Sequence, residues 1–260
     1  MNLTDDEVLK FQKGSPIFLE DICVIYPATI GEIVDEGYSK FQQYLSILTA
    51  GKPILDKNED PELKQLLSQL TDFQYILMML TTDLESNEVF KNACRFFFHE
   101  NRVSFSLDPA QIIFGSLEEK HILNERNFSE LQKILRHMYF IDHDNDDIVI
   151  YEDDDPAVRK LKMQLIERKE KLRRAKAKKA GKEDINLNFS DLIGSITINH
   201  CGLNIDNIWN ITYYAFHDQL TRMGWRDQFN INNQAAMAGA KLQKSQLKHW
   251  MRSIADSNKS

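Results

Sequence analysis

The middle of the chain carries two adjacent blocks of opposite charge that a hydrophobic core cannot accommodate. Residues 142–155 hold eight acidic side chains and no lysine or arginine. Residues 159–182 then hold twelve basic side chains against two acidic ones. Because unpaired charges are costly to bury, this stretch divides the chain into three parts, at residues 1–141, 142–184 and 185–260.

The basic block is expected to begin as a helix. Asp155 is a good N-cap residue, and Pro156 follows it at the first helical position. Apolar residues then recur at heptad spacing, at Val158, Leu161, Leu165 and Leu172. Because this apolar face fades beyond Leu172, the pattern predicts a projecting helix whose second half stays in solvent.

Two functions of the basic helix at residues 159–182 remain open. It could grip nucleic acid or an acidic partner, with Arg173, Arg174, Lys178 and Lys179 as the candidate basic patch. It could also be a solvated helix or linker. The run has no interleaved aromatic residues for base stacking, and the whole chain has a net charge of −7. Both facts favour the solvated helix, so nucleic acid is not the expected partner.

The acidic linker at residues 142–155 partly resembles a calcium loop. Asp142, Asp144 and Asp146 occupy the first, third and fifth positions of an EF-hand pattern, and Asp153 the twelfth. However, the sixth position, which needs glycine, is Asp147, and the twelfth lacks a bidentate glutamate. A solvated linker, which could also pair with the basic helix, is the preferred interpretation.

The remaining parts are predicted to be mainly helical, and the scarcity of Gly (10) and Pro (6) favours long helices. Residues 29–48 have one broad apolar face, which predicts a helix. A β-hairpin is predicted over residues 103–114. Apolar and polar residues alternate over residues 103–107, and the turn residues Asp108-Pro109 and the apolar run 112–114 follow. Residues 205–220 and 227–238 each predict a helix. The expected fold is mainly α with a minor β component: an N-terminal α+β domain, a projecting charged helix and a small C-terminal helical bundle.

No catalytic or metal-binding pattern stands out. The three cysteines, Cys23, Cys94 and Cys201, are far apart, and the histidines show no ligand spacing. The chain has no glycine-rich phosphate loop and no nucleophile elbow. No apolar run reaches the roughly 20 residues that span a bilayer, and the acidic N-terminus is unlike a secretory signal. We therefore expect a non-enzymatic intracellular protein with no metal, cofactor or membrane partner.

The C-terminal part is the candidate partner-binding region, because it contains all three tryptophans of the chain. Aromatic residues are common in the energetic centres of protein interfaces. Burial in a core is an equally good interpretation for any one of them. The predicted partner-binding residues are Trp209, Tyr213, Phe216, Leu220, Leu247 and Trp250.

The run from Ile208 to Leu220 (IWNITYYAFHDQL) resembles a segment of the tail assembly chaperones of long-tailed phages of Gram-positive bacteria. The later runs 236–240 and 247–251 are similar to the close of the same proteins. Residues 16–48 are loosely similar to phage tail and Gp15-like proteins, whereas the middle of the chain resembles neither group. The matching residues are apolar and aromatic rather than catalytic.

This resemblance implies a protein that binds the tape measure protein, keeps it soluble in the host cytoplasm and helps to recruit the major tail tube protein. Self-association into a homo-oligomer and a frameshifted longer form are left open. Two alternatives also remain. The protein could be a structural tail or baseplate component that stays in the virion, or a nucleic-acid-binding regulator that acts through residues 159–182.

Overall fold

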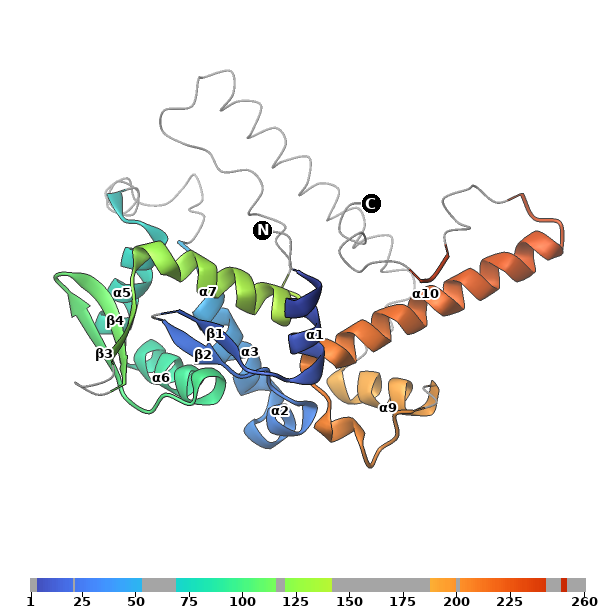
Figure 1. Ribbon diagram of the computed structural model, residues 1–260, viewed down its shortest axis with the longest axis horizontal. Helices are drawn as coiled ribbons and strands as arrows, with labels where there is room; N and C mark the ends of the chain where they lie inside the picture. The colour runs from blue at the N-terminus through green and yellow to red at the C-terminus, as the bar shows by residue number, and fades with distance from the viewer. Residues whose placement is uncertain are drawn as a thin grey trace, which may run out of the picture. The chain divides into compact units, whose positions relative to one another are not determined.

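The computed structural model describes residues 4–20, 22–52, 69–115, 120–141, 188–199, 202–241 and 249–251. Over these residues it is mainly helical with two small antiparallel sheets (Figure 1), which confirms the prediction of a mainly α fold with a minor β component. By their internal contacts, Met1–Phe140 and Ile193–Ser260 form one compact unit, and Ile141–Leu192 form another. Whether residues 1–141 and 185–260 are separately folding domains stays a prediction. In the described part of the chain, no helix is long and apolar enough to cross a membrane.

The N-terminal half contributes most of the helices that the structure describes. Four of them begin with a capping box, in which a Thr or Asn side chain and the residue three positions on satisfy each other's backbone N–H groups. The helices of this half are α1 (Asp5–Lys13), α2 (Ile30–Glu36), α3 (Tyr38–Thr49), α5 (Asp72–Thr82), α6 (Leu84–Phe98) and α7 (Glu125–Met138).

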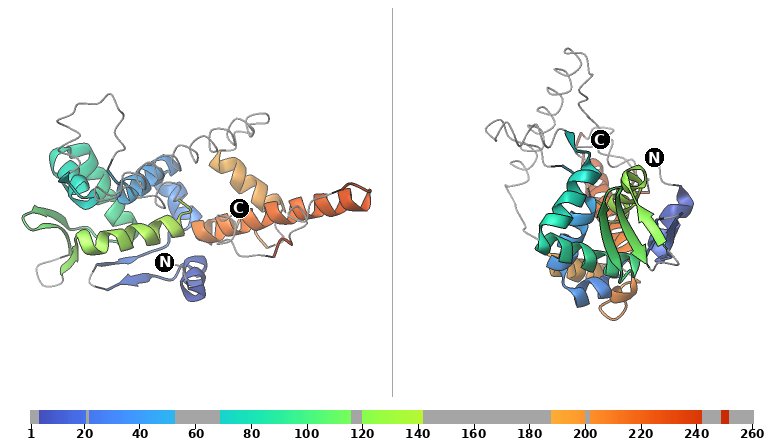
Figure 2. Two further views of the ribbon diagram at one scale, coloured as in Figure 1. Left: turned by 90° about the horizontal axis from the view of Figure 1, so that it is seen from above. Right: turned by 90° about the vertical axis from the view of Figure 1, so that its left-hand side faces the viewer.

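The strands form two separate sheets. β1 (Ile17–Leu19) pairs with β2 (Cys23–Ile25), and β3 (Val103–Leu107) pairs with β4 (Ala110–Gly115) and through it β5 (Lys120–Leu123). Val103 faces Phe114, and Leu107 faces Ala110, so the hairpin predicted at residues 103–114 is confirmed. Figure 2 shows this three-stranded sheet leading directly into α7.

The helix predicted over residues 29–48 is interrupted, which corrects the sequence-based expectation. Gly37 has φ 100° and ends α2, and α3 begins at the next residue. A left-handed conformation of this kind favours glycine. The apolar spacing continued through Gly37, because both helices turn buried faces toward the same core.

That core is rich in aromatic rings around Phe41, which is fully buried. The Phe41 ring lies 5.5 Å from that of Tyr139 and 5.3 Å from that of Tyr213, centroid to centroid. Tyr139 and Tyr213 are 5.7 Å apart. Tilted pairs at such distances are favourable geometries for aromatic rings. Tyr213 therefore completes a cluster that α3 and the end of α7 begin.

The C-terminal segment contains α9 (Phe189–Asn199), the short 3₁₀ helix η1 (Ile208–Asn210) and α10 (Tyr213–Met237). The helix predicted over residues 205–220 is wrong in its first half. Thr212 has an extended backbone and caps α10 instead of lying inside a helix. The helix predicted separately at residues 227–238 is the continuation of α10, which runs unbroken through Gly224.

Thr212 joins this segment to the N-terminal half. Its hydroxyl donates to the Phe11 carbonyl oxygen at 2.8 Å and accepts from the Ala215 backbone N–H at 3.0 Å. On either side, Ile30 N donates to Ile211 O, and Tyr213 N donates to Ala28 O, both at 2.9 Å. The exposed fraction of Thr212 is only 3%. Thr212 and its two neighbours thus tie α10 to both α1 and the start of α2.

We expect Thr212→Val to lower the free energy of unfolding by about 1–2 kcal/mol, because it removes an N-cap and leaves a buried carbonyl without its donor. Urea denaturation followed by circular dichroism measures the change. Thr82→Val is the control, since Thr82 is exposed and bonds only within its own helix. Equal effects of the two substitutions would contradict the role given to Thr212.

A second junction depends on Gly31. A Cβ atom at this position would lie 3.0 Å from the Trp209 carbonyl oxygen, which is a backbone atom of η1. We expect Gly31→Ala to destabilise the protein by about 1–3 kcal/mol, because η1 must move away. Gly224→Ala has open space within α10 and should instead stabilise by about 0.5–1 kcal/mol. Thermal unfolding of both variants checks the opposite signs, and a neutral Gly31→Ala would refute the close packing.

Candidate partner-binding surface

The long helix α10 changes character along its length. Its buried residues, Tyr213, Tyr214, Phe216 and Asp218, all fall within its first six positions. From Leu220 to Met237 every residue is half-buried or exposed. The first part of α10 therefore belongs to the core, and the rest offers a surface.

Two of the predicted partner-binding residues lie in the core. The exposed fraction of Tyr213 is 6% and that of Phe216 is 0%. Trp209, Leu220 and Trp250 are half-buried, and Leu247 lies outside the described residues. Partner binding by this set stays a prediction, but substitution of Phe216 would damage the core as well as any interface.

The charged segments that were candidate binding sites lie outside the described residues. They are the basic helix at residues 159–182, with Arg173, Arg174, Lys178 and Lys179, and the acidic linker at residues 142–155. In the part of the chain that the structure describes, no three His, Cys, Asp or Glu side chains are grouped so that they could hold a metal ion.

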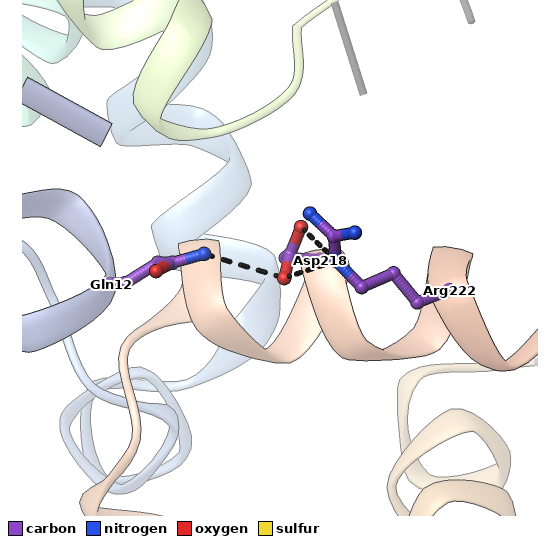
Figure 3. A network of polar contacts seen from close by, with 3 residues as sticks. All are labelled: Gln12, Asp218 and Arg222. Carbon is purple, nitrogen blue, oxygen red and sulfur yellow. Dashed lines mark hydrogen bonds and ion pairs between the residues drawn. The ribbon is translucent and has the colours of Figure 1, made fainter. Parts of the chain in front are cut away.

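A buried carboxylate anchors the first part of α10 (Figure 3). Both oxygens of Asp218 accept from Arg222 Nε at 3.0 Å, and Oδ2 also accepts from Gln12 Nε2 of α1 at 3.4 Å. The Asp218 side chain is 4% exposed and that of Arg222 is 34% exposed. A buried charge is tolerated when it is paired and hydrogen-bonded. The i,i+4 spacing of Asp218 and Arg222 was visible in the sequence, but their contact with Gln12 was not.

His217 is enclosed by aromatic rings next to this anchor. Its Nε2 atom lies 3.0 Å from the Tyr213 hydroxyl oxygen. Its ring stacks on Phe140 with centroids 5.1 Å apart and meets Phe216 edge-on. Burial lowers the pKa of His217, because the charged imidazolium loses its solvation there. The neutral ring is therefore the form that fits the folded protein.

The exposed apolar side chains of the C-terminal segment are the strongest sign of a binding surface. Ile231 is 59% exposed and Met237 is 90% exposed, both on the second part of α10. Another face of the same helix is partly covered, since the rings of Phe229 and His249 meet edge-on at 5.0 Å. Among the described residues of this segment, the other exposed large apolar side chains are Ile198, Ile205 and Met251. We name Ile198, Ile205, Ile231, Met237 and Met251 the exposed apolar set.

Comparison with known proteins adds one finding. The family model described as the second domain of YomV matches residues 176–255. YomV is a phage-associated family, so the match suggests a phage protein without pointing specifically to a tail assembly chaperone. No curated protein and no solved structure matches the chain. All of the exposed apolar set lies within the matched residues.

The burial of His217 predicts a loss of stability in mild acid. Its folded pKa is below the ordinary value of about 6.5, so the unfolded chain binds the proton more readily. The contribution of His217 is therefore complete above that value and is lost as the pH falls below it. We expect His217→Gln to lose less stability than the wild type between pH 7.5 and pH 5.5, measured by urea denaturation. An unchanged His217→Gln profile would disprove the assignment.

Proposed function

We propose that the protein is a non-enzymatic tail assembly chaperone of a phage, which binds the tape measure protein and keeps it soluble during tail morphogenesis. The YomV match supports the phage setting. The resemblance of residues 208–220 to tail assembly chaperones supports the finer assignment. The major tail tube protein would be a second partner, recruited once the tape measure is bound.

The observation that carries the proposal is the exposed apolar set. A single exposed leucine or isoleucine needs no explanation. Here, however, α10 continues for nineteen residues beyond its last buried side chain, from Gln219 to Met237, and exposes Ile231 and Met237 on that stretch. A helix that extends past its core in this way can pair with another helix.

A tape measure protein presents the matching chemistry. Long helices with apolar stripes aggregate in water unless the stripes are covered. A chaperone helix can cover such a stripe with apolar side chains of its own. Because Thr212 and Asp218 hold the first part of α10 in place, its second part can bind a partner helix without disturbing the core.

The test is co-expression with a tape measure protein that is insoluble when made alone. The wild-type chain should bring it into the soluble fraction, and Ile231→Asp with Met237→Asp should abolish the rescue. Asn230→Asp with Gln234→Asp is the matched control, because both residues are exposed on the same helix and the added charge is equal. Circular dichroism verifies that both double variants remain folded.

Unimpaired rescue by Ile231→Asp with Met237→Asp would refute the proposed surface. Mass spectrometry of purified phage particles tests the wider assignment. A tail assembly chaperone should be absent from the particles, whereas a structural tail or baseplate component would be present in them.

A further inference from the structure

A cleft of about 400 Å³ lies among α2, α3 and α6, apart from the C-terminal surface. Helix α2 lines it with the carboxylates of Glu32, Asp35 and Glu36. Helix α6 and the residue after it contribute Arg95 and His99. Neither the proposed function nor the YomV match, which begins at residue 176, accounts for this cleft.

The walls of the cleft are held in place by hydrogen bonds. Tyr26 N donates to Phe97 O at 2.8 Å, and Ala28 N donates to the Tyr139 hydroxyl at 3.0 Å. The Tyr44 hydroxyl donates to Glu36 Oε1 at 2.7 Å. Burial and this hydrogen bond raise the pKa of Tyr44 to about 12, so the hydroxyl remains protonated at neutral pH. The cleft is thus formed before any ligand arrives.

Aromatic rings also line the cleft. The ring of Tyr26 stacks on that of His99 with centroids 3.9 Å apart, and His99 adopts a left-handed conformation at the end of α6. On another wall, the rings of Tyr44 and Phe96 lie 6.0 Å apart. Ring faces attract cations that approach them. The cleft therefore combines negative charge with aromatic surface.

The charges of the side chains that line the cleft determine which kind of ligand it can bind. Three carboxylates face one guanidinium, that of Arg95, so an anion is disfavoured. The same carboxylates are not among any group of residues, within the described ranges, that could hold a metal ion. The Glu32 carboxylate already accepts from the Thr29 backbone N–H and hydroxyl, so Asp35 and Glu36 are the carboxylates that can accept from the N–H donors of an organic cation.

The chain already places one ammonium group at the edge of the cleft. Lys40 Nζ lies 3.7 Å from Glu36 Oε1, and the Lys40 side chain is 64% exposed. Exposed pairs of this kind are weak, so a second cation can compete for Glu36. This contact shows which charge Glu36 attracts.

We propose that the cleft is a binding site for an organic cation, namely a guanidinium or primary ammonium group. The group could belong to a small amine or to an arginine or lysine side chain of another protein. In either case its donors bond to the carboxylates of Asp35 and Glu36, while its apolar carbon chain lies against Tyr26 and Phe96.

The test is a titration of the ¹⁵N-labelled full-length protein with agmatine and, separately, with the peptide acetyl-Ala-Arg-Ala-amide. Saturable shifts of the backbone amides at residues 28–36 and 92–99 are expected with both. The same peptide with citrulline in place of arginine should cause none, because citrulline is neutral. Tighter binding of the arginine peptide would identify a protein side chain as the ligand, and tighter binding of agmatine a small amine.

Two substitutions should shift the affinity in opposite directions. Asp35→Asn removes a carboxylate and should weaken binding roughly two- to fivefold, whereas Lys40→Gln removes the competing ammonium and should strengthen it by a similar factor. Glu130→Gln and Lys91→Gln make the same changes in net charge outside the cleft lining. Equal effects at the cleft and control positions, or shifts that spread over the protein without saturating, would overturn the proposal.

Discussion

The hydroxyl of Thr212 makes the contact on which the arrangement of the two ends of the chain depends. It bonds to a carbonyl 201 residues away in α1 while also capping the helix that follows it. The neighbouring backbone groups pair with residues 28 and 30. Tyr213 then enters the aromatic cluster at a fixed position, and Asp218 reaches Gln12 from the next turn of the helix. The close fit of Gly31 against Trp209 follows from the same placement.

The sequence predicted local structure well where a short pattern was sufficient. The β-hairpin at residues 103–114 was found from alternation and a turn, both of which act between near neighbours. The break at Gly37 was missed, because the apolar spacing reports only which side chains are buried. The role of Thr212 was missed for a related reason. Its spacing from Ile208 and Phe216 suits a helical face, but its carbonyl partner belongs to a distant segment.

The functional residues were harder to predict from sequence. An aromatic residue at helical spacing has the same pattern whether it faces a core or a partner, and Tyr213 and Phe216 proved to be buried. The exposed Ile231 and Met237 were not predicted as partner-binding residues, because single apolar residues in a polar helix resemble ordinary surface residues. The cleft could not be predicted from the sequence, because residues 26–44 and residues 92–99 come together only through the packing of α2 and α3 near α6.

The position of Tyr213 has a consequence for how the chain acquires its structure. During synthesis, Phe41 and Tyr139 leave the ribosome long before the ring that completes their cluster. Contacts this distant in sequence are formed late and at a high entropic cost. Until Tyr213 has been made, part of the apolar interior of the N-terminal half is therefore exposed to water, a state that favours aggregation. Rapid closure of the last helix thus matters to this chain as much as the stability of the finished fold.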